Sequence, residues 1–436
     1  MEQTVAREAS GLEQIVQKTE PETRSMQLIR RSGQRLQLND LTVSELLSPQ
    51  EVKVFRVPAK VLGKVINFWG VMALHNNARG PYKGGIRLAS DVTLWETVEL
   101  SRLMTLKTAV TDIEFGGGKT GIRVNMRKMY ETFDRKPPDR DFEKIISLDA
   151  VEYYAQIYRN VFSAHVYIPA PDMGTGPDEM AFIFNETQDP ASVTGKPEGT
   201  HGWLPGRREA TGYGCCFVVL KVLKEILNKA PDQATVAVQG FGNVGGPLVR
   251  YLTENGLKVV AITDLYGGAR NADGLNYSML REHTDRVGSL AGFPGDAITN
   301  EELLALDVDV LIPAATGHVL TRKNAQQVRA KAIVEAANMP TSVEAMEILE
   351  EMGVYVVPDI LANAGGVIAS MEEYSRSLSA IKMTQQDVFS SIEGKIGENL
   401  DLALDKARLE HISLTEAAVQ IATDRVYQVM KRRRYI

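Results

Sequence analysis

The sequence predicts an α/β protein of two domains, one of which is built on a doubly wound parallel sheet. Three observations support this class: apolar segments of strand length alternate with helical segments, glycine-rich turns join them, and a polar stretch interrupts the chain near its middle. Beyond residue 209 the alternation is regular, as in a parallel sheet with helices between its strands. The strands expected there are residues 234–239, 257–263, 308–313, 332–335 and 354–357.

The first half of the chain also mixes strands and helices. Residues 68–75 and 121–125 are expected to be strands, because short apolar runs there end at glycine-rich or polar turns. Residues 94–109 have the apolar spacing of a helix and lie between two glycine-rich stretches. The first domain is therefore expected to be α/β as well.

The domain boundaries follow from length and composition. A chain of 436 residues exceeds one typical domain. Residues 189–208 are rich in Gly, Pro, Thr and Ser, and we interpret them as a linker or hinge. Near its end the chain turns helical and stays so. We therefore expect three segments, namely residues 1–205, 206–365 and 366–436.

Charge and composition argue against several classes of function. The formal net charge is −6, so there is no electrostatic reason to expect nucleic acid or an anionic membrane as a partner. The sequence has no apolar run long enough for a membrane-spanning helix and no visible secretory signal, so we expect a cytoplasmic protein. The two cysteines, Cys215 and Cys216, are adjacent and cannot staple distant parts of a fold. No metal site is expected.

A glycine-rich motif marks the start of the second domain's sheet. Residues 240–245 read GFGNVG, with Asn243 and Val244 between the glycines. An expected strand, residues 234–239, precedes the motif and an expected helix follows it. Asp264 ends the next strand, 19 residues after the motif. This context is typical of a dinucleotide-binding fingerprint, whereas the motif alone would fit any glycine-rich turn.

Each residue of the fingerprint has a physical role in holding a dinucleotide. Gly240 permits the tight turn, Gly242 lets the backbone approach a pyrophosphate, and Gly245 allows the helix to pack closely on the strand. Asp264 would accept hydrogen bonds from the adenosine ribose and repel a 2′-phosphate. NAD is therefore favoured over NADP, although Arg270 lies close enough in the sequence to offset the repulsion.

Three lysines and one acid lie in segments that suggest a binding pocket. Lys83 and Lys119 are flanked by glycines, Lys107 ends the expected helix between them, and Asp172 lies in a turn rich in Pro and Gly. A solvated lysine needs no tight backbone around it. Each lysine alone is more often a surface charge, but together they predict a cationic pocket for a small substrate that carries carboxylates.

The motifs together resemble those of the Glu/Leu/Phe/Val dehydrogenases. They occur in the family's order and span most of the chain. The matching stretches are HNNARGPYKGGIR (75–87), GGGKTGIRV (116–124), IPAPDMGTG (168–176), GRREATGYG (206–214), QGFGNVG (239–245), AANMPTS (336–342) and ANAGGVIAS (362–370).

The resemblance implies an organisation for the three segments. Residues 1–205 would form a substrate-binding and oligomerisation domain, to which residues 366–436 return as helices. Residues 206–365 would form a Rossmann-like domain for the nicotinamide cofactor. The resemblance also implies a hexamer, formed by this chain alone or together with a related chain.

The resemblance also assigns roles to individual residues. Lys119 matches the catalytic lysine, which activates water or polarises the substrate carbonyl. Asp172 matches the acid that shuttles a proton to and from the substrate nitrogen, and Lys107 matches the ligand of the α-carboxylate. The residues implied near the substrate and the nicotinamide are Thr211, Asn338 and Asn363.

Lys83 and Ser370 resemble the pair that grips a second, side-chain carboxylate. The leucine and phenylalanine enzymes look apolar at the first position, because their substrates carry no such group. The resemblance therefore favours glutamate, which would be deaminated oxidatively to 2-oxoglutarate and ammonia. Ser370 taken alone fits a helix N-cap equally well.

One departure from the family pattern leaves alternatives open. The family usually has glycine after the catalytic lysine, and this chain has Thr120, whose side chain could shift Lys119 or narrow the pocket. The alternatives are a non-catalytic regulatory subunit and a dehydrogenase for another amino acid. Lys119 and Asp172 argue against the first, and Lys83 argues against the second.

Overall fold

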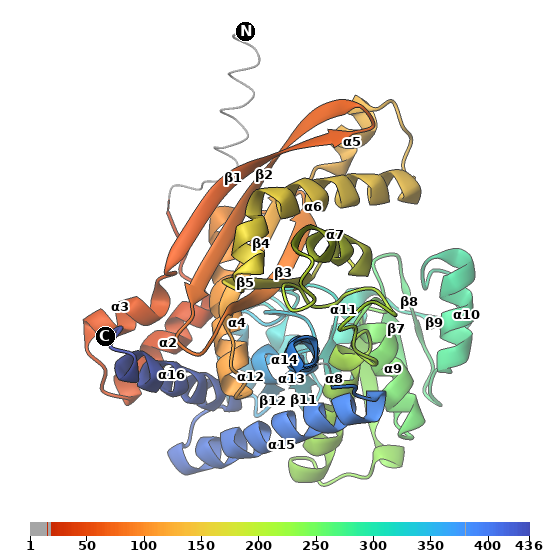
Figure 1. Ribbon diagram of the computed structural model, residues 1–436. Helices are drawn as coiled ribbons and strands as arrows, with labels where there is room; N and C mark the ends of the chain where they lie inside the picture. Colours follow the sequence, from red (N-terminus) through yellow and green to blue (C-terminus); the bar gives the residue numbers. More distant parts are fainter. Residues whose placement is uncertain (1–14, 16–18, 380) are drawn as a thin grey trace. The chain divides into compact units, whose positions relative to one another are not determined.

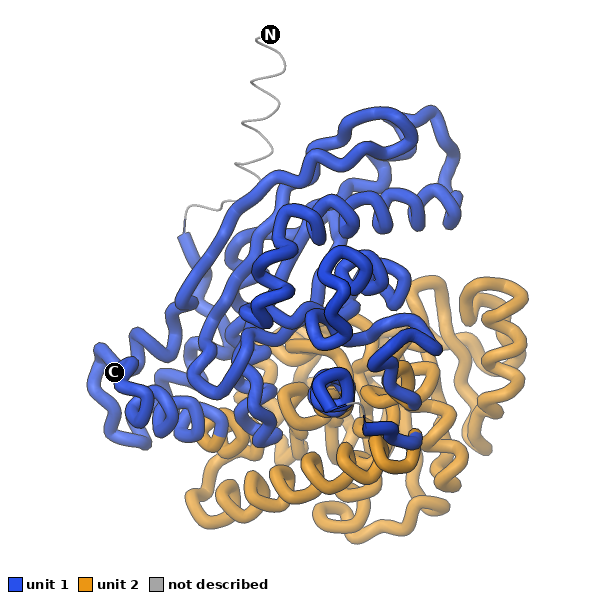
Figure 2. Tube along the Cα trace, viewed as in Figure 1, with its two compact units in different colours: residues 1–205, 370–384, 422–436 blue, residues 206–369, 385–421 orange. Residues whose placement is uncertain are grey.

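The computed structural model describes residues 15, 19–379 and 381–436, and the chain divides into two compact units (Figures 1 and 2). Each unit contains its own β-sheet. Unit 1 comprises Met1–Pro205, Ser370–Thr384 and Ala422–Ile436, and unit 2 comprises Gly206–Ala369 and Gln385–Ile421.

In the described part of unit 1, five strands form a mixed sheet in the order β1-β2-β4-β3-β5. Strand β2 pairs antiparallel with both β1 and β4, whereas β3 pairs parallel with both β4 and β5. The strands are β1 (Glu51–Val61), β2 (Lys64–Asn76), β3 (Tyr82–Ala89), β4 (Gly116–Arg123) and β5 (Tyr167–Pro171).

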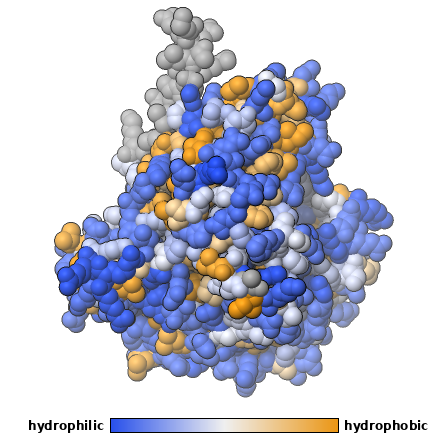
Figure 3. Space-filling model, in the orientation of Figure 1, coloured by the Kyte–Doolittle hydropathy of each residue, from blue (hydrophilic) through white to orange (hydrophobic). Residues whose placement is uncertain are grey.

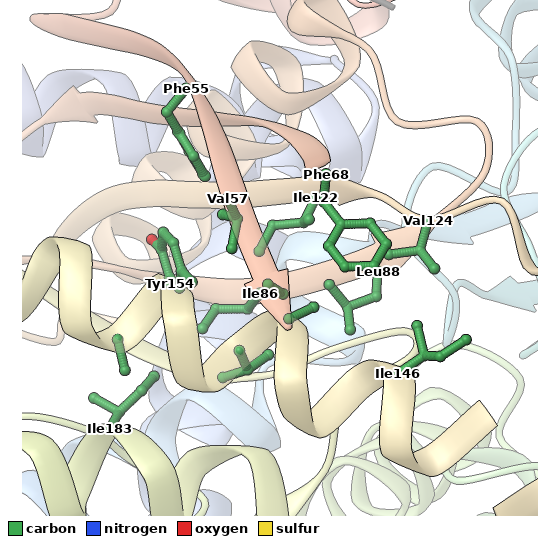
Figure 4. Close-up of a cluster of buried hydrophobic side chains, with 14 of the residues drawn as sticks. Phe55, Val57, Phe68, Ile86, Leu88, Ile122, Val124, Ile146, Tyr154 and Ile183 are labelled. Atoms are coloured by element: carbon green, nitrogen blue, oxygen red, sulfur yellow. The ribbon is translucent and has the colours of Figure 1, made fainter. Parts of the chain in front are cut away.

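A hydrophobic core fills the space between this sheet and helix α6 (Arg140–Ser163). Alternate residues of the strands, such as Phe55, Ile86 and Ile122, point toward Tyr154 of α6 (Figure 4). The rings of Phe55 and Tyr154 stack with their centroids 5.4 Å apart. This alternation leaves the other set of side chains on the opposite face of the sheet.

The helices of unit 1 come from both ends of the chain. Helix α14 (Gly365–Ser379) contributes its residues from Ser370 onward, and α16 (Leu414–Arg432) its residues from Ala422 onward. The other helices described in unit 1 are α2 (Arg24–Arg35), α3 (Asp40–Leu47), α4 (Leu94–Val110), α5 (Met126–Thr132), α6 and α7 (Pro177–Thr187).

The predicted doubly wound parallel sheet is confirmed in unit 2. Its described strands run in the order β12-β11-β10-β6-β7-β8-β9, and all neighbouring pairs are parallel except β7/β8 and β8/β9. The sequence did not predict β8 and β9, which are too short for a hydrophobic period to be visible. The strands are β6 (Thr235–Gln239), β7 (Lys258–Thr263), β8 (Gly268–Arg270), β9 (Asp296–Ala297), β10 (Val310–Pro313), β11 (Ala332–Val334) and β12 (Tyr355–Val357).

Helix α15 (Gln385–Glu410) belongs to unit 2, although the sequence groups it with the segment that returns to the first domain. Its residue Phe389 stacks on Tyr213 of α8 with ring centroids 3.8 Å apart, and Asp401 accepts a 2.5 Å hydrogen bond from Lys221. The other α-helices described in unit 2 are α8 (Ala210–Glu225), α9 (Gly245–Glu254), α10 (Tyr277–Val287), α11 (Asn300–Leu304), α12 (Val343–Glu351) and α13 (Asp359–Ala362).

The Gly- and Pro-rich stretch at residues 189–208 is buried in its first part. Residues 191–196 are all buried. The four glycines of the stretch have positive φ angles between 78° and 81°, a conformation that favours glycine. The composition that suggests a linker therefore serves tight turns. These glycines are Gly195, Gly199, Gly202 and Gly206.

The visible surface is dominated by hydrophilic side chains, with apolar residues scattered between them (Figure 3). Among the described residues, none of the helices combines the length and the apolar character needed to cross a lipid bilayer.

Candidate active site

Lys119 and Asp172 form an ion pair in unit 1. Lys119 lies on β4, and its Nζ donates a hydrogen bond to Oδ2 of Asp172, the residue that follows β5. The turn after β5 holds the acid in place, because the N–H of Asp172 donates to Thr175 Oγ1 at 2.9 Å and the N–H of Met173 donates to Asp172 Oδ1 at 2.8 Å. The two residues that the sequence assigns to proton transfer are therefore in direct contact.

The charge state of Asp172 follows from these contacts. Burial raises the pKa of the carboxyl, but the Lys119 ammonium, the hydrogen bonds from Lys119 and Met173, and the Arg87 guanidinium lower it further than burial raises it. The net result is a pKa below the ordinary value of 3.8. Asp172 is thus ionised at neutral pH.

The register of the sheet gathers the predicted lysines on one face. Lys83 pairs with Gly117 across β3 and β4, and Lys119 lies two residues after Gly117, so all three share a face. Helix α4 packs on this face so closely that a Cβ on Gly117 would lie 2.2 Å from Thr105 Oγ1. Lys107 lies on α4. Lys83 and Lys119 therefore lie on this face of the sheet, and Lys107 lies on the helix that covers it.

The lysines and the serine predicted to bind carboxylates are buried. Lys83 is only 1% exposed, and its Nζ donates a 3.1 Å hydrogen bond to the carbonyl oxygen of Ile168 on β5. Lys107 and Ser370 are buried in the same unit. These lysines place positive charge in the interior of unit 1, which favours an anionic ligand at this face of the sheet.

Thr120 points away from the lysines, because neighbouring residues of a strand face opposite sides of the sheet. Its Oγ1 lies 2.8 Å from the hydroxyl of Tyr154, at the centre of the α6 core. The threonine that departs from the family pattern therefore fills the core rather than the lysine face.

We predict that Thr120→Val lowers the free energy of unfolding by about 1–3 kcal/mol, because it leaves the buried Tyr154 hydroxyl without its partner. Turnover should change by less than about twofold, since the lysine face is untouched. In the double variant with Tyr154→Phe, much of the loss should be recovered, because both polar groups are then absent. Chemical denaturation of the unaltered protein, the Thr120→Val and Tyr154→Phe variants and the double variant measures the coupling free energy between Thr120 and Tyr154. A large loss of turnover at unchanged stability would place Thr120 in the pocket instead.

In unit 2 the glycine-rich loop has the shape that a pyrophosphate requires. Gly240 has a φ of 105°, and a Cβ on Gly245 would lie 1.9 Å from the Gly240 carbonyl oxygen. A Cβ on Gly242 would meet no atom of the described residues within 4 Å, so this part of the backbone is open to a ligand. Helix α9 begins at Gly245 and directs its first N–H groups toward the loop. The residues present fit a dinucleotide, with Asn243 and Val244 completing the loop.

Asp264 lies at the end of β7, as predicted, but its carboxylate already has backbone partners. Oδ1 accepts from the N–H groups of Tyr266 at 2.8 Å and Gly267 at 3.0 Å. Oδ2 accepts from the N–H of Leu290 at 2.6 Å. A carboxylate has about four acceptor positions, so the charge remains and capacity for a ribose hydroxyl is left.

The other predicted residues of unit 2 lie near the carboxyl ends of its strands. The Asn363 amide donates to Asn338 Oδ1 at 3.2 Å and to the carbonyl oxygens of Ala336 and Ala337. Thr211 lies on α8, where a Cβ on Gly366 would be 2.5 Å from its Oγ1. The structure therefore joins Asn363 to Asn338 and places Thr211 beside the start of α14.

Sequence reasoning missed two buried charged residues of unit 1, Lys196 and Glu373. The available signal was weak: Lys196 is a lysine between Gly195 and Pro197, the same kind of context that singled out Lys83 and Lys119. Glu373 lies within a helical segment and has no sequence feature that distinguishes it from a surface glutamate.

Comparison with known proteins shows the family to which the chain belongs. Residues 202–434 match the family model of the Glutamate/Leucine/Phenylalanine/Valine dehydrogenases, and residues 49–189 match the dimerisation domain of the Glu/Leu/Phe/Val dehydrogenases. The chain belongs to this family. As a member of the Glu/Leu/Phe/Val dehydrogenases, it combines an N-terminal domain with a C-terminal nucleotide-binding domain.

Two curated members of the family are similar over nearly their whole length. The NADP-specific glutamate dehydrogenase of Saccharolobus shibatae is 36% identical over 413 residues, which cover 90% of this chain and 92% of the relative. The NAD-specific glutamate dehydrogenase A of Halobacterium salinarum is 35% identical over 427 residues, which cover 95% of this chain and 94% of the relative.

Solved structures of the family share the fold. The hetero-hexameric glutamate dehydrogenase of Thermus thermophilus, in a leucine-bound form, superposes with a TM-score of 0.85 at 29% identity and covers 96% of this chain and 99% of its own. The enzyme of Peptoniphilus asaccharolyticus superposes with a TM-score of 0.78 at 28% identity and covers 94% of this chain and 99% of its own.

Proposed function

We propose that this member of the family is a glutamate dehydrogenase, which interconverts L-glutamate with 2-oxoglutarate and ammonia and transfers a hydride to or from a nicotinamide cofactor. The observation that carries the proposal is Lys83, a buried lysine on the same sheet face as Lys119. The second carboxylate of glutamate is complementary in charge to this lysine and can accept a charge-assisted hydrogen bond from it, whereas an apolar substrate side chain cannot.

In this proposal two groups of residues hold the substrate by its ends. Lys83 and Ser370 bind the side-chain carboxylate, and Lys107 binds the α-carboxylate. Charge-assisted hydrogen bonds at both ends fix the position of Cα between them.

Lys119 and Asp172 carry the proton chemistry. The bound cofactor supplies the hydride acceptor for Cα in the direction of deamination. Asp172, ionised and held by Lys119, accepts a proton from the substrate nitrogen and returns it to the departing ammonia. Lys119, after its own proton has passed to solvent, takes a proton from the water that attacks the iminium carbon of the substrate and so returns to the ammonium form. The ion pair in the structure is the starting arrangement for both transfers.

The nicotinamide cofactor is proposed to bind at the glycine-rich loop of unit 2. The pyrophosphate would lie over Gly242 at the start of α9, and Thr211 and Asn338 would lie near the nicotinamide. Asp264 favours NAD over NADP, because its negative charge opposes a 2′-phosphate. The curated relatives include one NAD-specific and one NADP-specific enzyme, so the preference needs its own measurement.

We also propose a hexameric assembly. The match of residues 49–189 to a dimerisation domain and the hetero-hexameric relative from Thermus thermophilus support it. The same relative supports mixed assembly with a related chain as the alternative composition.

An absorbance assay of reduced-cofactor oxidation tests the proposed activity. The purified chain is given 2-oxoglutarate and ammonia with NADH or with NADPH. We expect oxidation that requires both substrates, with a higher kcat/KM for NADH. A folded protein that binds the dinucleotide but turns over neither cofactor would contradict the proposal and favour a regulatory subunit.

A further inference from the structure

A buried ion pair outside the predicted site joins the segment before unit 2 to helix α14. The side chains of Lys196 and Glu373 are both 0% exposed, and Lys196 Nζ lies 2.8 Å from Glu373 Oε1. The Glu373 carboxylate also accepts backbone hydrogen bonds from the N–H of Gly195 at 2.7 Å and of Lys196 at 3.2 Å. Glu373 thus holds the backbone of the segment as well as the lysine side chain.

The Lys196 ammonium is equally well satisfied. Besides Glu373 it contacts three other acceptors, all in unit 1: the carbonyl oxygens of Pro190 at 2.8 Å and Val193 at 2.9 Å, and Ser377 Oγ at 3.4 Å. The pair therefore closes residues 190–196 into a compact loop and fastens that loop to one face of α14.

One side of this connection is fixed to the strand that precedes Asp172. The N–H of Thr194 donates to the Pro169 carbonyl oxygen at 3.0 Å. Gly195 packs so tightly that a Cβ there would lie 2.3 Å from Cδ of Pro171. Both prolines belong to β5, whose Ile168 carbonyl also accepts the hydrogen bond from Lys83.

The other side is fixed to the helix that carries Ser370. Glu373 lies three residues after Ser370 on α14, so the two side chains occupy neighbouring positions on one helix face. Lys83 and Ser370 are therefore connected by a series of contacts through β5, the loop around Gly195, and Glu373. Every contact in that series lies within unit 1.

We propose that Lys196 and Glu373 are positioning residues for recognition of the substrate's side-chain carboxylate. By fixing α14 against β5, they set the distance between Ser370 and Lys83, the two residues proposed to hold that carboxylate. A buried ion pair contributes little net stability compared with an apolar pair of similar size, so its main effect is on geometry. This inference rests on the proposed function.

The test compares two substrates that differ only in the distal carboxylate. For each variant, kcat and KM are measured with 2-oxoglutarate and with 2-oxopentanoate, which has the same chain length and no second carboxylate. The variants are Glu373→Gln, which removes the charge at constant shape, and the double variant Lys196→Met/Glu373→Leu, which leaves no unpaired buried charge. Thermal unfolding of each variant is recorded. If the double variant does not fold, the kcat and KM values of Glu373→Gln alone test the proposal.

We expect KM for 2-oxoglutarate to rise about tenfold or more and the preference for 2-oxoglutarate over 2-oxopentanoate to fall by a similar factor, the equivalent of about one hydrogen bond to a charged group. The matched control is the partly exposed pair Lys53–Glu51, changed to Met and Leu, which should leave the preference unaltered. Equal losses with both substrates would overturn the inference, because a purely structural role affects both alike.

A Lys83→Leu variant measured in parallel separates this inference from the proposed function. If Lys83→Leu does not lower the preference for 2-oxoglutarate, the proposed substrate recognition fails. If Lys83→Leu lowers it and the Glu373 variants do not, the proposed function stands and the positioning role is wrong.

Discussion

Replacement of Asp172 by asparagine is expected to lower kcat by roughly 10²- to 10⁴-fold, the usual contribution of a general acid or base. Asparagine keeps the shape of the side chain but cannot accept a proton from the substrate nitrogen. It also leaves Lys119 without its buried counter-ion. Steady-state rates in both directions, with KM measured alongside kcat, would show the loss in turnover rather than in binding.

The matched control is Asp178→Asn, at an exposed carboxylate in the first turn of α7. This control should retain turnover within about a factor of two, because a surface ion pair contributes little. If Asp172→Asn kept most of its kcat, Asp172 would have to be removed from the proton-transfer step.

The pH dependence of the same reaction follows from the sign of the Asp172 pKa shift. Because the folded pKa lies below 3.8, the carboxylate is the predominant form in the free protein above that pH. The stability that the Lys119–Asp172 pair contributes is present above pH 3.8 and is lost as the pH falls through the folded pKa. Titration of Asp172 therefore does not account for any fall in kcat/KM that begins above pH 5. If the unaltered protein shows such a fall, its midpoint should be the same in the Asp172→Asn variant.

Replacement of Lys83 by leucine is expected to lower kcat/KM for 2-oxoglutarate by on the order of 10²- to 10³-fold, because the distal carboxylate of the substrate then enters a buried site without its cation. The same change should raise kcat/KM for 2-oxopentanoate, whose apolar end fits beside leucine. The preference between the two substrates is therefore expected to invert or nearly disappear.

The exposed residue Lys60, also on a strand of the unit 1 sheet, provides the control. Lys60→Leu removes the same charge from the same sheet, and it should leave the substrate preference unchanged. A Lys83→Leu protein that still preferred 2-oxoglutarate by the original factor would show that the distal carboxylate is recognised elsewhere.

The sequence predicted the doubly wound sheet because its strands carry a strong apolar signal and alternate with helices. It did not predict β8 or β9, because strands of three and two residues carry too few side chains to show a period. It interpreted residues 189–208 as a linker or hinge, and the boundary between the two units does fall within this stretch, after Pro205, but residues 191–196 are buried. Glycine and proline mark tight turns as readily as flexible linkers, and composition alone does not distinguish the two.

The candidate site was predictable where local sequence reveals the chemistry. Lys83 and Lys119 stand out by their glycine neighbours, and the loop at residues 240–245 stands out by its spacing. The pair of Lys196 and Glu373 was not predictable, because the two residues lie 177 positions apart and only the tertiary fold brings them together. The side of the sheet on which Thr120 lies likewise depends on the exact register of β4.

The backbone hydrogen bonds of Asp264 have a consequence for protein engineering. Three N–H groups, from Tyr266, Gly267 and Leu290, use this one carboxylate as their acceptor. A substitution made only to admit a 2′-phosphate would remove the charge and at the same time leave those amides without the group around which two loops are arranged. If Asp264 sets the cofactor preference as proposed, redesign of that preference requires a replacement acceptor for the loops, and position 264 has to be altered together with the residues around 290.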